Sequence, residues 1–283
     1  MPVVFVLIWS TGFIVARLGM PYAPPFSFLE TRYVLSLLLF IAWIQLAGAQ
    51  WPNQKKQYMH LAVTGALMHA GYLGGVWAAV KLGMGAGLSA LIVGLQPVLT
   101  GIWLSARGGA IKRLQWAGLV LGFIGVFLVL FQKIEATTEV SNESLMCACL
   151  ALFSITSGTL YQKRYVTPCD VRTANFIQLV SAAVFTLPLA MFETETIQLT
   201  PSFLTAMCWS VVGLTLGGSS LLYLLIQRGA ATTVSSLMYL VPPCTAVIAW
   251  LLFDESITKV TLIGIFVTAL GVALVARNVN LVK

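Results

Sequence analysis

The stretch from Ala86 to Ala106 is about 20 residues long, carries no formal charge and has one proline near its middle. An α-helix needs about 20 apolar residues to cross the hydrocarbon core of a bilayer. Pro97 has no backbone N–H, so the carbonyl of Val93 loses its usual helical partner. The stretch Thr232 to Leu252 has the same pattern 146 positions later, with Pro243 at the place of Pro97. The chain therefore contains this predicted membrane helix twice.

The composition of the chain leaves no room for a sizeable soluble domain. Of its 283 residues, 59% are hydrophobic and 9% are charged, whereas soluble domains average about 25% charged residues. The five cysteines lie mostly in apolar stretches without a CxxC pair, so neither a disulfide framework nor a zinc site is expected. We predict an all-α integral membrane protein that crosses the bilayer many times.

Apolar runs separated by short polar or Gly/Pro breaks predict ten transmembrane helices. The first, within Met1–Gly19, is expected to be retained, because it has neither the charged start nor the cleavage site of a signal peptide. The predicted helices span residues 2–19, 26–47, 57–80, 86–106, 114–132, 144–165, 172–192, 202–227, 231–252 and 259–276.

The offset of 146 residues holds without a gap across all five pairs of predicted helices. In the fifth pair, for example, Gly118 matches Gly264, whereas the second pair matches least well. Because five is an odd number, the second copy enters the membrane from the opposite side. We predict two inverted five-helix repeats, residues 1–132 and 144–276, which is a recurrent plan among secondary transporters.

The basic residues predict the orientation of the chain in the membrane. With the N-terminus inside, 11 of the 16 Lys and Arg residues fall on the inner side and 5 on the outer side. Short cytoplasmic loops carry the excess of positive charge in membrane proteins. We therefore expect both termini in the cytoplasm.

Signatures of enzyme active sites are missing from the sequence. It contains no HExxH, G-x-S-x-G or Walker A motif. The run Gly83-Met-Gly85-Ala-Gly87 lies between two predicted helices, where a flexible turn is the plainer interpretation. We expect no enzyme activity, no cofactor and no metal ion.

Polar and aromatic side chains at membrane depth mark the candidate solute site, because burying polar groups in a bilayer is costly. His69 lies in the middle of the third predicted helix, and Tyr72 follows on the same helical face. His69 either lines a cavity or makes a structural hydrogen bond to a neighbouring helix. The predicted substrate-binding residues come from both repeats: Trp9, Ser10, His69, Tyr72, Gln96, Ser157, Tyr161, Ser219, Tyr223 and Tyr239.

Charged residues near the outer side are candidates for a gate. Glu30 is the only acid within a predicted span, Arg32 follows two residues later, and Arg17 ends the first helix at a similar depth. An ion pair of Glu30 with Arg17 or Arg32 could close the outer side. Snorkelling of these side chains to the lipid headgroups explains them equally well.

The prolines of the fourth and ninth helices are candidate hinges. Gln96 precedes Pro97 in the first copy, whereas Pro242 precedes Pro243 in the second. The second copy therefore frees a further carbonyl, that of Met238. We predict that Gln96 contacts solute and that the paired prolines form the more bent, mobile element.

Several short motifs occur in order along the chain. They are Trp9-Ser-Thr-Gly-Phe13, Leu29-Glu-Thr-Arg32-Tyr33, Leu95-Gln-Pro-Val-Leu99, Gly158-Thr-Leu-Tyr-Gln-Lys-Arg164, Leu240-Val-Pro-Pro243 and Asp254-Glu255. Over essentially the whole chain they resemble the drug/metabolite transporter superfamily, EamA type. The resemblance implies ten helices, a central cavity, alternating access and, for bacterial members, export of small polar metabolites, often amino acids. One departure is Ser105-Ala-Arg107-Gly-Gly109, where family members usually carry a Gly-Glu pair.

The preferred hypothesis is a secondary transporter of the bacterial inner membrane that exports small metabolites, amino acids or related amphipathic solutes. One alternative is an intramembrane lipid-modifying enzyme that uses His69 with a serine. Another is a non-transporting assembly subunit. The expected partners are a small-molecule substrate and the lipid bilayer, with no nucleic acid, and the expected assembly is a monomer or a homodimer.

Overall fold

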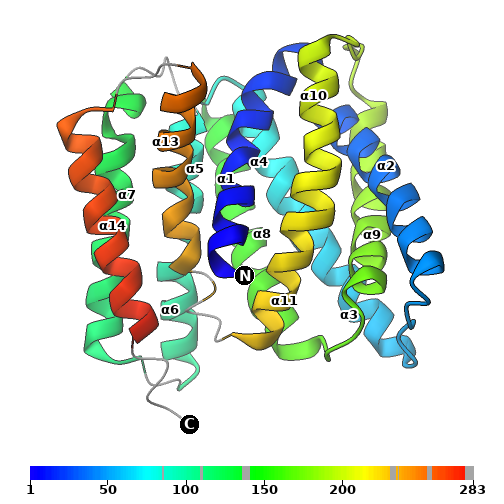
Figure 1. The fold of residues 1–283 in the computed structure, drawn as a ribbon, viewed down its shortest axis with the longest axis horizontal. Helices are drawn as coiled ribbons and strands as arrows, with labels where there is room; N and C mark the ends of the chain where they lie inside the picture. The colour runs from blue at the N-terminus through cyan, green and yellow to red at the C-terminus, as the bar shows by residue number, and fades with distance from the viewer. Residues whose placement is uncertain are drawn as a thin grey trace.

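The computed structural model describes residues 1–84, 86–108, 111–135, 141–229, 234, 236–253 and 257–277. Within these ranges every regular element is a helix. Eight helices are long and apolar enough to cross a membrane, and two shorter apolar helices span Leu237–Leu252 and Lys259–Val275. In Figure 1 the helices stand side by side with roughly parallel axes. The prediction of an all-α membrane protein is confirmed.

The first repeat contains five spans, three of which are single continuous helices. These are α1 (Pro2–Gly19), α2 (Pro25–Leu46) and α7 (Arg113–Glu135); a short 3₁₀ turn, Met20–Tyr22, follows α1. The third span consists of α3 (Lys55–Gly65), a π-helical segment (Ala66–Gly71) and α4 (Tyr72–Lys81), and the fourth of α5 (Ala86–Val93) and α6 (Gln96–Ala106).

The second repeat divides in the same places. Its continuous helices are α8 (Asn142–Tyr165), α9 (Val171–Met191) and α14 (Lys259–Arg277). The eighth span consists of α10 (Pro201–Trp209), a π-helical segment (Ser210–Ser219) and α11 (Ser220–Arg228), and the ninth includes a 3₁₀ turn (Leu237–Leu240) and α13 (Val241–Phe253). The π-helical segments of the two repeats coincide under the 146-residue offset. Such wide turns are frequent at functional sites.

The prolines begin new helices instead of bending continuous ones. Pro97 is the second residue of α6, and Pro242 and Pro243 lie in the first turn of α13. The first turn of a helix tolerates proline, because its N–H groups have no intrahelical partner. The expected continuous helix over residues 86–106 is therefore two helices, separated by a turn at Gly94 and Leu95. A hinge role for these prolines stays a prediction.

Close packing of α7 against α14 makes the inverted symmetry visible at the level of atoms. A Cβ atom on Gly118 would lie 2.8 Å from the carbonyl oxygen of Gly271, and one on Gly264 would lie 2.7 Å from that of Gly125. The offset converts the first of these pairs into the second, as expected for equivalent helices packed in opposite directions. In Figure 1 the two helices lie together at the left edge of the bundle and run in opposite directions.

Two clamps between the repeats hold the ends of α2 and α9. The Glu193 carboxylate, in the loop after α9, accepts hydrogen bonds from the backbone N–H groups of Phe26 (2.8 Å) and Ser27 (2.7 Å) and from the Ser27 hydroxyl. At the other end, Thr173 in α9 donates to the carbonyl of Gln50 in the loop after α2. Ser27 and Thr173 are equivalent positions of the two repeats. The two clamps are therefore counterparts, but only one uses a charge.

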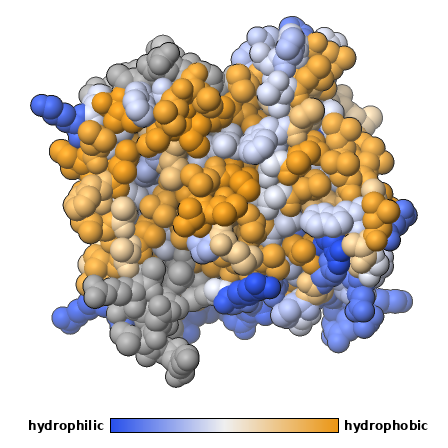
Figure 2. All heavy atoms as spheres, in the orientation of Figure 1, coloured by the Kyte–Doolittle hydropathy of each residue, from blue (hydrophilic) through white to orange (hydrophobic). Residues whose placement is uncertain are grey.

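The surface of the bundle is suited to lipid. Large apolar side chains such as Leu38, Phe185 and Phe266 are exposed on the outside of the helices. Figure 2 shows hydrophobic residues over most of the visible face and hydrophilic ones along its lower edge. Exposed apolar area of this extent is found where a protein meets a membrane. We call the end where α3 begins and where α6, α8 and α11 finish the basic end, because it carries basic residues such as Lys55, Arg107, Arg164 and Arg228.

Candidate functional site

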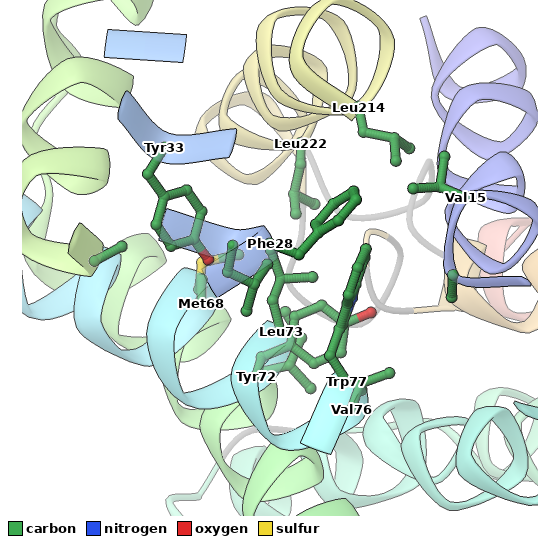
Figure 3. Close-up of a cluster of buried hydrophobic side chains, with 14 of the residues drawn as sticks. Val15, Phe28, Tyr33, Met68, Tyr72, Leu73, Val76, Trp77, Leu214 and Leu222 are labelled. Carbon is green, nitrogen blue, oxygen red and sulfur yellow. The ribbon is translucent and has the colours of Figure 1, made fainter. Parts of the chain in front are cut away.

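A pocket of about 570 Å³, including its opening, lies between α1, α2, α4 and the π-helical segment of the eighth span. We call it the arginine pocket. It is lined by Trp9, Gly12, Ala16, Arg32, Tyr72, Leu73, Val76, Trp77, Val80 and Leu214. In Figure 3, Trp77 projects from α4 toward the helices that carry Val15 and Leu214. The walls of the pocket are thus apolar and aromatic, with a single cation.

That cation is the guanidinium of Arg32, which is only 3% exposed. Its Nε donates a hydrogen bond of 2.7 Å to the hydroxyl of Thr215, which in turn donates to the carbonyl of Ser210. Among the described residues no carboxylate forms an ion pair with Arg32. Buried charges in proteins are ordinarily paired, because desolvation is costly. The arrangement can therefore accept an anionic group of a ligand.

A second pocket, of about 240 Å³ with its opening included, lies beyond Trp9 and is lined by two amides, two hydroxyls, His69 and apolar side chains. We call it the amide pocket. Its lining residues are Trp9, Met68, His69, Gln162, Gln178, Ser219, Leu222 and Tyr223. The Nε2 atoms of Gln162 and Gln178 are buried and have no hydrogen-bond partner among the described residues. Unsatisfied buried donors of this kind are rare in proteins and indicate a place for a polar ligand or for water.

The two pockets are counterparts under the repeat. The offset of 146 residues pairs Ala16 with Gln162, Arg32 with Gln178, Leu73 with Ser219, Val76 with Leu222, Trp77 with Tyr223 and Met68 with Leu214. It also pairs His69, beside Gln178, with Thr215, the partner of Arg32. Trp9 lines both pockets and lies between them. The duplicated chain thus builds one pocket twice, with a cation in one copy and neutral amides in the other.

The structure brings six of the predicted polar and charged residues into these two pockets. Trp9, Tyr72 and Arg32 line the arginine pocket, and His69, Ser219 and Tyr223 line the amide pocket, which Trp9 also borders. The backbone carbonyl of His69 accepts a hydrogen bond of 2.9 Å from the Tyr33 hydroxyl. That bond helps to hold the π-helical segment against α2.

Five of the predicted residues lie elsewhere. Ser10 donates to the carbonyls of Val6 and Val241, and the ring of Tyr239 packs against Gly122 of α7. Gln96 donates to Thr159 over 3.2 Å, while its amide oxygen has no hydrogen-bond partner among the described residues. Ser157 and Tyr161 line a separate groove between α6 and α8.

The proposed gate residues have separate partners. Glu30 accepts a hydrogen bond of 2.9 Å from the Thr186 hydroxyl, whereas Arg32 donates to Thr215. The side chain of Arg17 lies outside the described residues. A gate built on these charges stays a prediction.

Among the residues that the predicted site left out are Gln162 and Gln178 of the amide pocket and Thr215, the partner of Arg32. The signal that could have found them is the internal repeat itself. Adding 146 to Ala16 and Arg32 gives the two glutamines, and adding it to His69 gives the threonine. All three pairs differ in chemistry, because Ala16 matches Gln162, Arg32 matches Gln178 and His69 matches Thr215.

Inverted helical repeats around a pair of polar and aromatic pockets are an arrangement that recurs among membrane transporters. The chain belongs to the EamA-like transporter family, whose model matches residues 2–131 and again residues 143–277. It is a multi-pass membrane transporter of small metabolites, and neither a lipid-modifying enzyme nor an assembly subunit is supported.

Similar proteins agree with this assignment. The chain is 27% identical to the "Uncharacterized transporter YvbV" of Bacillus subtilis over 95% of its own length and 88% of that protein. It is 23% identical to the "Uncharacterized inner membrane transporter YedA" of Escherichia coli, over 95% and 87%. It is 24% identical to a "Probable amino-acid metabolite efflux pump" of Salmonella typhimurium, over 92% and 88%. A solved crystal structure shares the fold with a TM-score of 0.81, over 98% of this chain and 96% of that one, at 16% identity.

Proposed function

We propose that this chain exports small amphipathic metabolites that carry an anionic group such as a carboxylate. The observation that carries the proposal is the buried guanidinium of Arg32, which lines an aromatic pocket without an acidic partner among the described residues. A carboxylate would supply the missing negative charge, and Tyr72 and Trp77 would cover the apolar part of the same solute. The Salmonella relative, named an amino-acid metabolite efflux pump, supports a solute of this kind and its export.

Alternating access would enlarge the arginine pocket and the amide pocket in turn, since the two are counterparts in inverted repeats. Residues 1–132 and 144–276 would form the two halves, with Trp9 as the barrier between the pockets. The helix breaks at Pro97 and at Pro242-Pro243 would absorb the movement. The basic end faces the cytoplasm of a bacterial cell in this proposal, because cytoplasmic loops carry the excess of Lys and Arg. The transporter would work as a monomer or a homodimer.

Two probes that differ only in a carboxylate charge test whether binding requires the anionic group. We expect an aromatic amino acid to raise the unfolding temperature of the purified protein, and its carboxamide to leave it unchanged. Arg32→Gln should abolish the shift, and Arg32→Lys should retain part of it, because a lysine keeps the charge without the guanidinium geometry. The matched control is Arg228→Gln, since Arg228 is exposed and lines neither pocket.

Efflux of the same radiolabelled amino acid from proteoliposomes gives the functional readout. Arg32→Gln and Tyr72→Ala should both slow efflux, whereas Arg228→Gln should not. Equal protection by the acid and its carboxamide, or normal efflux by Arg32→Gln, would overturn the assignment of the anion to Arg32.

A further inference from the structure

A third cavity lies outside both pockets. It is a groove of about 1110 Å³, open side included, between α6 and the last turns of α8. We call it the lateral groove. Its lining residues are Leu99, Ile102, Trp103, Ala106, Arg107, Phe153, Thr156, Ser157, Leu160, Tyr161, Arg164 and Tyr165. Neither the arginine pocket nor the amide pocket shares a lining residue with it.

The apolar part of the lateral groove faces the surrounding membrane. Ile102 and Trp103 of α6 are about half exposed, and Phe153 of α8 is 60% exposed. All three lie on long apolar helices, at depths where the protein meets hydrocarbon. The groove therefore opens sideways to lipid.

The polar part of the groove lies at the basic end, where the helices finish. Arg107 follows the last residue of α6, and Arg164 lies in the last turn of α8. Neither guanidinium has an ion pair or a hydrogen bond among the described residues. Instead, the Arg107 guanidinium carbon lies 4.6 Å from the centre of the Trp103 ring, and that of Arg164 lies 5.4 Å from the centre of the Tyr165 ring.

Stacking on an aromatic ring uses the flat face of a guanidinium and leaves its N–H edge free for an anion. On the α8 side of the groove, His60 of α3 contacts the rings of Tyr161 and Tyr165. Nδ1 of His60 lies 2.8 Å from the Tyr161 hydroxyl, and the His60 ring stacks on that of Tyr165. The wall that carries Arg164 is therefore braced before any ligand arrives.

The internal repeat supplies a comparison for this groove. At the equivalent positions of the other repeat, Leu18 replaces Arg164, Gly19 replaces Tyr165, and Ala249 replaces Trp103. There, α1 and α13 are joined directly, since Thr245 donates a hydrogen bond of 2.9 Å to the Ser10 carbonyl. At these three positions one contact between repeats thus carries leucine, glycine and alanine, whereas the other carries Arg164 and two aromatic residues.

We propose that the lateral groove binds an anionic phospholipid of the surrounding membrane. Its phosphate would lie between Arg107 and Arg164, and an acyl chain would run along Ile102, Leu160 and Phe153. The groove has cations at the helix ends and apolar residues further along the helices. This order matches the headgroup and acyl chain of an anionic phospholipid better than it matches a soluble ion. Basic pockets between transmembrane helices are known binding places for such headgroups.

Quenching of Trp103 fluorescence tests this proposal in the intact protein. The protein is reconstituted in phosphatidylcholine that contains increasing fractions of brominated phosphatidylglycerol, and subtraction of the Trp103→Phe signal isolates the tryptophan in the groove. In Arg107→Gln/Arg164→Gln, the fraction that gives half-maximal quenching should rise roughly thirtyfold, since each basic residue near the surface contributes about fivefold. Arg228→Gln, at the same end but outside the groove, should behave as the wild type.

Three outcomes would overturn the proposal. The first is that brominated phosphatidylcholine quenches Trp103 as effectively as brominated phosphatidylglycerol. The second is that the double glutamine variant shows the same dependence of quenching on the phosphatidylglycerol fraction as the wild type. The third is that millimolar glycerol phosphate relieves the quenching, which would assign the groove to a soluble phosphate compound. Arg107→Lys/Arg164→Lys guards against misfolding, because it should retain a preference for phosphatidylglycerol and unfold at the wild-type temperature in phosphatidylcholine.

Discussion

Arg32 and Gln178 occupy equivalent positions of the two repeats, yet one is a cation and the other a neutral amide. Each lies beside the π-helical segment of the opposite repeat, where Thr215 and His69 are again equivalent. The two pockets are therefore built from equivalent positions but differ in charge. A solute anion would be held strongly in one of them and weakly in the other. Such a difference lets a transporter bind its solute in one state and release it in the next.

Replacing Arg32 should separate binding from stability. We expect Arg32→Met to unfold at the same or a higher temperature than the wild type, because it removes the desolvation cost of a buried cation without an ion-pair partner among the described residues. Binding of the anionic solute should be lost. Thermal unfolding in detergent, with and without solute, measures both.

The matched variant is Thr215→Val, which leaves the Arg32 Nε without its partner. We expect this change to destabilise the protein by about 1–3 kcal/mol. A large loss of stability in Arg32→Met itself would indicate that the guanidinium serves mainly to hold the fold.

At the scale of elements, the bundle is held by helices that pair with their own counterparts. Pairing of α7 with α14 depends on glycines at Gly118 and Gly264, where any side chain would meet the backbone of the other helix. The pair formed by α2 and α9 is held at both ends, because the start of each helix bonds to the loop that follows the other. Only the clamp at Glu193 involves a charge and several backbone donors. This asymmetry makes that end of the α2–α9 pair the firmer one.

Removing the Glu193 carboxylate should loosen the start of α2. A carboxylate that accepts several hydrogen bonds at a helix N-terminus is worth about 1–3 kcal/mol. We expect Glu193→Ala to lower stability by this amount and to speed amide hydrogen exchange at Phe26 and Ser27.

Glu195 provides the control two residues further on. Its ion pair with Lys81 is largely exposed, and exposed pairs contribute about 0–1 kcal/mol. Faster exchange at the start of α2 in Glu195→Ala, equal to that in Glu193→Ala, would contradict the clamp.

At the scale of the whole molecule, two inverted repeats turn the same local sequence pattern toward both sides of the membrane. Equivalent parts then become different in function, because each meets a different partner. The contact of α6 with α8 is an open dibasic groove, whereas at the equivalent contact Thr245 of α13 donates a hydrogen bond to the Ser10 carbonyl of α1. Inversion therefore lets a duplicated chain build a pair of pockets and a lateral groove from the same sequence pattern.

The orientation of the molecule is a prediction at this scale. In a variant without native cysteines, Asn53→Cys in the loop after α2 should resist a membrane-impermeant maleimide added to intact cells. Thr194→Cys in the loop after α9 should react, because that loop lies at the opposite end of the bundle. Permeabilising the cells should expose both. The reverse pattern would place the basic end outside.

The approximate positions and the duplication of the membrane helices could be predicted from the sequence, because hydrophobicity acts locally along each segment, whereas the helix break before Pro97 was not predicted. The same reasoning named Trp9, His69, Tyr72 and Tyr223, since a polar side chain in an apolar run is conspicuous by itself. Only the tertiary structure decided which of the predicted residues meet. It places Ser157 and Tyr161 in the groove between α6 and α8, and it brings Arg32 to Thr215 across the repeat boundary. The reason is that the rotation of each helix about its axis depends on packing against helices far away in the sequence.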